Sequence, residues 1–150
     1  MNRLYIALAA AVLAATPVLA QADTTAARSA RGAEVIRELN QGRNQPNLEA
    51  MRNEFPFLAQ ATEAYALGDV WSRPGLDNRT RQLAAVAAMA ALGETGMMRV
   101  HAGYALNIGV SENELKEIIY MVTVPAGFPR AIAASQVLAQ LFQERRAAGQ

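Results

Sequence analysis

The feature that most constrains the fold of this chain is a series of helix start and stop signals on an Ala-rich background. Alanine is abundant and β-branched residues are few and scattered, which favours helix over strand throughout. Asp77 is a good N-cap for a helix over 78–92, and Gly93 follows as its stop. A capping box from Ser111 to Glu114 opens another helix. The chain is therefore predicted to be an all-α bundle.

Similar signals place the other helices. A loop is expected over 72–76, because Arg73 precedes a proline and a glycine follows it. A last helix is expected from Pro129, with an apolar stripe that extends to Phe142. The remaining helices are predicted over residues 30–41, 47–53, 56–71, 94–108 and 112–125. No repeat of fixed period is visible in the sequence.

Residues 1–22 have the layout of a secretory signal peptide. Arg3 supplies one positive charge, an almost unbroken apolar run follows over 4–20, and Ala20-Gln21-Ala22 is a small-x-small cleavage site. An uncleaved membrane anchor is the alternative, but the run is at the short edge for a spanning helix, and Pro17 favours cleavage. We therefore expect a periplasmic or secreted protein, with no stable membrane insertion after cleavage.

The rest of the chain is expected to form one domain. Residues 23–29 are small and polar and are predicted to be a flexible leader, which leaves a single domain over 30–150. Because 52% of the full chain is hydrophobic, and a small domain buries a limited share of its surface, apolar faces are expected to be shared between copies. The protein is therefore predicted to be an obligate homo-oligomer.

Charge and residue types exclude several classes of protein. Loss of Arg3 with the signal peptide leaves 13 basic and 13 acidic residues, so nothing in the chain attracts nucleic acid or an acidic membrane. The absence of cysteine excludes a disulfide framework and a thiolate metal site. The single histidine, His101, excludes a multi-histidine zinc site within one chain.

Three short blocks and His101 carry information about function. The blocks are Gly68-Asp69-Val70-Trp71-Ser72-Arg73-Pro74-Gly75-Leu76, Arg79-Thr80-Arg81-Gln82-Leu83 and Ala126-Gly127-Phe128-Pro129, with the turn Gly109-Val110 before the last. In this order and spacing they resemble the decarboxylase branch of the carboxymuconolactone decarboxylase family, over roughly residues 50–142. The resemblance implies a helical bundle of the alkylhydroperoxidase D-like type. It also implies a homo-oligomer, since family members form trimers and hexamers.

His101 is the first candidate for chemistry. Met97, Tyr104, Ala105 and Ile108 share its helix face, because they lie three, four or seven residues away. An imidazole on an apolar face is partly desolvated, so its neutral form is favoured and it can transfer protons near neutral pH. A core histidine held by one hydrogen bond is the alternative. The family has its active-site histidine at this position, which favours the functional interpretation.

Three arginines are the next candidates. Arg73 lies in a loop stiffened by Pro74, and Arg79 and Arg81 lie in the first turn of a helix. A guanidinium can hold a carboxylate through two parallel hydrogen bonds. A helix N-terminus favours anions, so an arginine there suggests an acidic partner, either a ligand or a neighbouring glutamate. A surface or inter-subunit salt bridge is the alternative for all three.

Four further residues complete the candidates, and two of them have two interpretations each. Trp71 is either a pocket wall or a packing staple, and Phe128 lies in a turn that the resemblance places near the pocket. Glu114 fits a helix cap. Glu117 matches a recurring family glutamate, and is either a second carboxylate of the site or a structural partner for an arginine.

The sequence also departs from the family. The peroxidase branch, similar to alkylhydroperoxidase D, uses Cys-x-x-Cys-x-x-x-His with an upstream glutamate as proton relay. Here Glu94 and Met97 stand at the cysteine positions and Gln82 at the glutamate position. Thiol peroxidase chemistry needs a thiolate, so it is excluded. Pro125 stands where the decarboxylase branch commonly has an aromatic residue, and the export signal contrasts with the cytoplasmic decarboxylase of aromatic degradation.

The resemblance implies decarboxylation of a small unsaturated lactone that carries carboxylates. It implies no cofactor and no metal ion, because the substrate supplies its own electron sink. The protein must hold a second carboxylate, stabilise the oxyanion and deliver a proton to carbon. Arg73 and Arg81 suit the first two tasks, His101 suits the third, and Glu117 would tune it. The resemblance also places Trp71, Arg79 and Phe128 against the substrate.

The alternative function is a non-catalytic exported binding or assembly module of the same fold. In that case the pocket beside the histidine would be filled by Met97, Tyr104 and Phe128. An open pocket lined by arginine would instead favour the enzyme.

Overall fold

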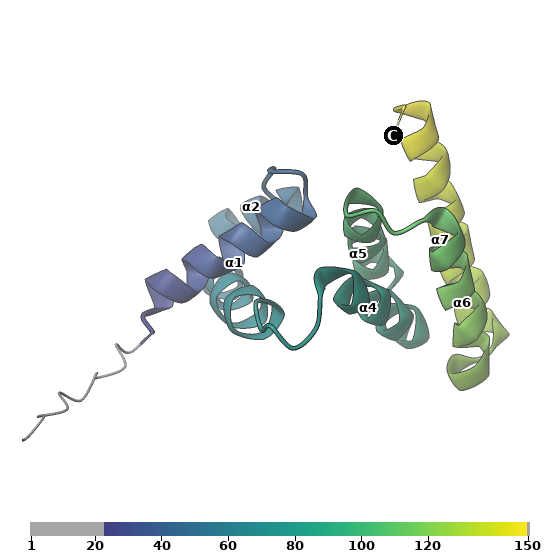
Figure 1. Ribbon diagram of the computed structural model, residues 1–150, viewed down its shortest axis with the longest axis horizontal. Coiled ribbons are helices and arrows are strands. Elements are labelled where there is room, and N and C mark those ends of the chain that lie inside the picture. The colour runs from purple at the N-terminus through teal and green to yellow at the C-terminus, as the bar shows by residue number, and fades with distance from the viewer. Residues whose placement is uncertain (1–22, 150) are drawn as a thin grey trace, which may run out of the picture.

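The computed structural model describes residues 23–149, and helices joined by short connections make up that stretch (Figure 1). The helices are α1 (Thr25–Leu39), α2 (Pro46–Glu54), α3 (Pro56–Ala61), the π-helix η1 (Thr62–Trp71), α4 (Asn78–Leu92), α5 (Thr95–Asn107), α6 (Glu112–Ala126) and α7 (Phe128–Ala147). No strand occurs between residues 23 and 149, so the all-α prediction is confirmed. The predicted signal peptide, residues 1–22, lies outside the described residues.

The local helix signals are confirmed where they were strongest. The Asp77 carboxylate accepts a hydrogen bond from the backbone N–H of Thr80 at 2.8 Å, and Gly93 ends α4 with a φ of 83°. Ser111 and Glu114 form the reciprocal capping box, with the Ser111 backbone N–H donating to the Glu114 carboxylate at 2.9 Å. Within the described stretch, no helix is long and apolar enough to cross a bilayer.

The first helix begins earlier than the sequence analysis predicted. Residues 25–29, assigned there to a leader, form the first turns of α1. The Thr24 hydroxyl caps this end by accepting from the backbone N–H of Ala27 at 3.1 Å. Asp23 adds an ion pair with Arg31, whose Nη1 donates to the Asp23 carboxylate at 2.8 Å. The composition suggested a leader because the stretch is polar, but a cap and one turn of Ala-rich sequence suffice to extend the helix.

Two glycines bring α1 and η1 into backbone contact. A Cβ atom on Gly32 would lie 2.1 Å from the carbonyl oxygen of Glu63, and one on Gly68 would lie 2.1 Å from that of Arg28. Real Cβ atoms do not approach a backbone oxygen so closely, so both positions require glycine. Gly68 is the first residue of the Gly-Asp-x-Trp-Ser-Arg block, and its place in that block is explained by this crossing.

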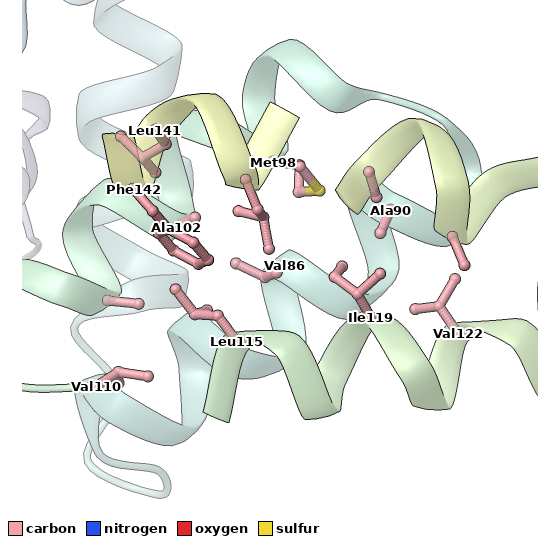
Figure 2. Packing of buried hydrophobic residues seen from close by; sticks show 14 residues of the cluster. Val86, Ala90, Met98, Ala102, Val110, Leu115, Ile119, Val122, Leu141 and Phe142 are labelled. Atoms are coloured by element: carbon pink, nitrogen blue, oxygen red, sulfur yellow. The ribbon is translucent and has the colours of Figure 1, made fainter. Parts of the chain in front are cut away.

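Helix α5 contributes residues to two hydrophobic clusters. In the view of Figure 1 it lies between α1 and α2 on one side and α6 and α7 on the other. On one side Met98 and Ala102 pack in a cluster with α4, α6 and α7, which includes the fully buried Val86 and Leu115 (Figure 2). On the other side Tyr104 joins a cluster formed by α1 and α2, with Val35, Ile36, Leu39 and Leu48 among its members. His101 therefore lies on a helix whose two faces are held by separate cores.

We predict that Gly68→Ala destabilises the protein. Its Cβ would meet the Arg28 carbonyl of α1, so the two helices would have to separate. The expected loss is about 2–3 kcal/mol in the free energy of unfolding, the upper part of the range for overpacking. Chemical denaturation followed by circular dichroism measures it.

Gly103→Ala is the matched control, since a Cβ there meets nothing within 4 Å. This variant is expected to keep or gain stability, by up to about 1 kcal/mol, because alanine is the better helix former. Equal stability of the two variants would contradict the proposed crossing.

Candidate active site

The Gly68–Leu76 block ends η1 and starts a loop that is tied to α1. The Asp69 carboxylate accepts from Arg28 Nε at 2.9 Å and also pairs with Arg31, so two α1 side chains hold it. The hydrogen bond from Arg28 lowers the pKa of Asp69 below its ordinary value. The Ser72 hydroxyl donates to the Gly68 carbonyl at 2.5 Å, which closes the last turn of η1 before Arg73.

Arg81 holds the far end of the same loop. Its Nε donates to the carbonyl of Leu76 at 3.2 Å, and its Nη2 donates to the carbonyl of Arg73. The guanidinium is thus engaged with loop backbone, where the sequence analysis expected it to contact substrate. In this structure Arg81 positions Arg73 and the rest of the loop.

Arg79 has the acidic partner that its place at a helix N-terminus suggested. It forms an ion pair with Glu114, which joins the start of α4 to the start of α6. This is the neighbouring-glutamate alternative considered above. Glu114 therefore serves both as the cap of α6 and as the partner of Arg79.

A cavity of about 370 Å³ opens between α1 and this loop. Its lining includes Arg31, Glu34, Glu38, Trp71, Arg73 and Asp77. Most of these charged groups already have partners: Glu34 pairs with Arg37, Glu38 accepts from Asn78, Asp77 caps α4, and Arg31 pairs with Asp23 and Asp69.

Arg73 is the exception among the charged residues of the cavity. Among residues 23–149, its guanidinium has no hydrogen bond or ion pair, and its side chain is exposed. A guanidinium has five N–H donors and is charged at all physiological pH values. Arg73 is therefore the group in this cavity that is available to hold a carboxylate.

Two aromatic rings enclose His101. The ring of Trp71 lies 5.3 Å from the imidazole, centroid to centroid and tilted by 31°, and that of Tyr104 stands edge-on at 5.9 Å. Burial lowers the pKa of His101 below its ordinary value of 6.5, because the charged imidazolium is poorly solvated there. The imidazole is therefore neutral at neutral pH, as its apolar helix face predicted.

The link between His101 and Arg73 is indirect. The sequence suggested that both border one pocket, but His101 is not among the residues that line the 370 Å³ cavity. Trp71 connects the cavity with the surroundings of His101, because it lines the cavity and its ring packs near the imidazole. It also packs against the α1–α2 cluster, so the pocket-wall and packing interpretations both hold.

Gln82 makes the polar contact of His101. The two side chains meet at 2.8 Å, between His101 Nδ1 and Gln82 Oε1, and Gln82 is fully buried on α4. An amide oxygen only accepts, so Nδ1 carries the proton and the neutral ring keeps its lone pair on Nε2. In the sequence, Gln82 stands out only as the position of a glutamate in the peroxidase branch. Its distance of nineteen residues from His101 gave no local signal of this contact.

Two buried N–H groups beside His101 have no acceptor. They are Gln82 Nε2 and Trp71 Nε1, which find no hydrogen-bond partner among residues 23–149. An unsatisfied buried donor costs about 1–3 kcal/mol, so such groups are uncommon and require an explanation. Both belong to the residues that contact the imidazole. Trp71 lines the 370 Å³ cavity, whereas Gln82 and His101 do not.

Two candidates lie apart from this group. Glu117 is exposed on α6, and Phe128 at the start of α7 is 70% exposed. Neither is hydrogen-bonded to His101 or lines the 370 Å³ cavity. Between residues 23 and 149, no three His, Asp or Glu side chains gather in a way that could hold a metal ion.

Comparisons with known proteins identify the family of this chain. The sequence profile of the carboxymuconolactone decarboxylase family matches residues 56–140. A 4-carboxymuconolactone decarboxylase of Acinetobacter baylyi is 36% identical over 112 residues, which are 74% of this chain and 81% of that protein. A nitrosuccinic acid decarboxylase of Metarhizium robertsii is 34% identical over 90 residues, 57% of this chain and 62% of the relative. An uncharacterized 15.0 kDa protein of Paracoccus denitrificans is 24% identical over 115 residues, 75% and 86% of the two chains. The chain belongs to the carboxymuconolactone decarboxylase family.

Proposed function

We propose that this protein is a carbon–carbon lyase that removes carbon dioxide from a small carboxylated substrate without a cofactor. The observation that carries the proposal is the pair of buried N–H groups, on Trp71 and Gln82, that flank a neutral imidazole and have no acceptor. Decarboxylation next to a conjugated carbonyl generates an oxyanion, and buried N–H donors are the groups that stabilise one. The two decarboxylases among the relatives support the same reaction class.

The reaction begins with a carboxylate held at Arg73. Its guanidinium has no other partner within the described part of the chain and stands in the cavity beside Trp71. The bond to the leaving carboxylate breaks, carbon dioxide departs, and the electron pair moves into the carbonyl conjugated with that carbon. The N–H groups of Trp71 and Gln82 donate to the oxygen on which the charge collects. A small lactone with two acidic groups is the substrate class that uses all of these contacts.

His101 supplies the proton that the carbon needs. Its Nδ1–H donates to Gln82, so the free nitrogen, Nε2, takes a proton from solvent and transfers it to carbon. The imidazolium formed on the way is stabilised by the oxyanion, and the transfer returns the ring to its neutral form. Gln82 acts as a positioning residue here, because it fixes which nitrogen is free.

The non-catalytic alternative required the pocket to be filled. Of the three residues that would fill it, Met97 is 48% exposed and Phe128 is 70% exposed, so neither is packed as a plug. Tyr104 is buried, and its ring stands edge-on to the imidazole with 5.9 Å between the two centroids. These positions favour the enzyme.

We predict that His101 and Arg73 contribute differently to turnover. With 4-carboxymuconolactone and nitrosuccinate as test substrates, release of carbon dioxide measures kcat and KM. His101→Ala is expected to lower kcat about 100-fold or more, the usual contribution of a general acid. Arg73→Ala is expected to raise KM about 10-fold or more, because it removes a charged hydrogen bond to substrate.

The matched control is Arg146→Ala, which removes an exposed arginine paired with Glu112 at the far end of α7. It should leave both constants unchanged. If the wild type releases no carbon dioxide from any carboxylated lactone, or if His101→Ala equals the wild type, the proposed reaction is wrong.

We predict that Gln82→Glu raises the pKa of His101. In the wild type, burial keeps that pKa below 6.5, so protonation opposes folding. The corresponding share of stability is present above pH 6.5 and is lost as the pH falls through that value toward the lower folded pKa. In Gln82→Glu, a carboxylate would stand 2.8 Å from Nδ1 of His101. It favours the charged imidazolium, so His101 becomes protonated at a higher pH than in the wild type.

The measurement is direct because the chain has one histidine. The imidazole C2–H proton resonance is followed by NMR across the pH range. Gln82→Met, which has similar length but no charge, serves as the control and should not raise the pKa. An unchanged titration in Gln82→Glu would show that the two side chains do not meet in solution.

We also propose that the protein assembles as a homo-oligomer, a trimer or a hexamer. Large apolar side chains are exposed on α4, α6 and α7, namely Leu92, Tyr120, Met121, Val124, Phe128 and Ile132. Val124 is 86% exposed, which costs solubility in a free monomer. The resemblance to trimeric and hexameric family members supports the same conclusion.

Val124→Glu is therefore expected to lower the particle mass measured by sedimentation, because it places a charge among the exposed apolar side chains of α4, α6 and α7. Gln136→Glu, an exposed α7 position with the same charge change, should leave the mass unaltered. A folded wild-type monomer at micromolar concentration would overturn this proposal.

We further propose that the protein is periplasmic or secreted, which rests on the signal-peptide layout of residues 1–22. The mature chain is expected to begin near Asp23. Mass spectrometry of protein from the periplasm measures this, and an intact Met1 in a membrane fraction would contradict it.

A further inference from the structure

We propose that a second groove, separate from the cavity at Arg73, binds a small molecule that carries two oxyanion groups, either carboxylates or phosphates. The groove has a volume of about 340 Å³ and lies between the turn before α2, one side of α5 and the end of α7. It is lined by three arginines, Arg43, Arg99 and Arg145, together with side-chain amides and the Tyr104 hydroxyl. None of the residues assigned above to the reaction lines it.

The charged residues that line the groove are all positive. Its three arginines come from three different elements, and no acidic residue is part of its lining. Glu144 stands outside the lining and pairs with Arg99, while Arg145 donates to the side-chain oxygen of Asn107 at 3.0 Å. Arg43 donates to the Asn40 carbonyl and the Gln41 side chain. Only Arg99 of the three is therefore paired with a carboxylate in the described part of the chain, which leaves an excess of positive charge. The cavity at Arg73 is different, because its acids and bases are nearly balanced.

Arg99 gives an independent indication of a ligand. Its Nη1 is buried and has no hydrogen-bond partner among residues 23–149, although its Nη2 is paired with Glu144. A buried N–H of a charged group is costly without an acceptor. An oxyanion in the groove would supply that acceptor, as a second carboxylate or a phosphate oxygen does in paired arginine sites.

The shape of the groove depends on two glycines of α5. Gly96 and Gly103 both line it and lie seven residues apart, on the same face of the helix. A Cβ on either would meet nothing within 4 Å, so the space above this face is open. Gln45 donates to the Tyr104 hydroxyl oxygen at 2.8 Å, so the hydroxyl hydrogen of Tyr104 is free to donate. The lining therefore offers donors from several directions.

Tyr104 connects this groove to the candidate active site. Tyr104 and Gln45, which donates to the Tyr104 hydroxyl, are both part of the lining, while the Tyr104 ring stands edge-on to His101 at 5.9 Å. A ligand that accepts a hydrogen bond from Tyr104 is expected to alter the surroundings of the imidazole. The chain has one histidine, so its NMR signal reports the effect without ambiguity.

Isothermal titration calorimetry of the purified protein with inorganic phosphate, pyrophosphate and succinate tests the proposal, with acetate as the single-charge control. We expect at least one of the three to bind with a Kd of about 1 mM or lower, and acetate to bind more weakly. Tighter binding of pyrophosphate than of succinate would identify a phosphate ligand. Tighter binding of succinate would identify a dicarboxylate. The His101 C2–H resonance should shift on saturation.

Matched variants locate the binding. Arg99→Gln and Arg145→Gln are expected to weaken it about tenfold or more, each by the loss of a charged hydrogen bond. Arg146→Gln has the same charge change one residue further along α7, outside the groove, and should bind like the wild type. Gly103→Ala should weaken binding while the circular dichroism spectrum stays helical. Arg73→Ala should bind normally, because Arg73 lines the other cavity and not this groove, and this separates the groove from the site of the reaction proposed above.

Three results would overturn the proposal. They are the absence of binding at millimolar concentrations of every probe, equal weakening by Arg99→Gln and Arg146→Gln, and loss of binding in Arg73→Ala. Equal weakening would mean attraction to net charge alone. Loss in Arg73→Ala would place the anion in the cavity at Arg73. Thermal unfolding of each variant distinguishes a binding defect from a folding defect.

Discussion

The contact between α1 and η1 at Gly32 and Gly68 determines where the candidate site can form. At both positions a Cβ would meet a backbone carbonyl at 2.1 Å, so the helices cross at a distance that only glycine allows. This crossing brings Asp69 to the arginines of α1 and directs the end of η1, with Trp71, toward α5. A π-helix is wider than an α-helix and commonly occurs at functional sites, where it re-aims a side chain.

The surroundings of His101 combine desolvation with one well-placed amide. Burial alone would give a neutral histidine of uncertain tautomer. The oxygen of Gln82 selects the form with the proton on Nδ1 and leaves Nε2 free. The same amide contributes a buried N–H without an acceptor, as does Trp71. One neutral base and two donors of this kind suit a reaction that generates an oxyanion and then needs a proton.

The cavity at Arg73 and the groove at Arg99 differ in how their charged side chains are paired. In the cavity at Arg73, nearly every charged group is engaged in an ion pair, a cap or a loop contact, and Arg73 alone stands out. In the groove at Arg99, guanidinium groups gather without acids in the lining. Tyr104 belongs to the lining of the groove, and its ring also lies beside His101.

The sequence alone determined the helical class, the two ends of α4, the start of α6 and the family. These depend on local rules, because a cap involves residues three positions apart, as Asp77 and Thr80 are. The apolar face around His101 also follows from helical spacing, and with it the direction of its pKa shift.

The partners of the charged and polar side chains were decided by the tertiary structure. Gln82 meets His101 across nineteen residues, Arg79 meets Glu114 across thirty-five, and Asp69 meets Arg28 across forty-one. Nothing in the local sequence selects such pairs, because they depend on how the helices cross. For the same reason Arg81, expected against substrate, became the residue that holds the Arg73 loop.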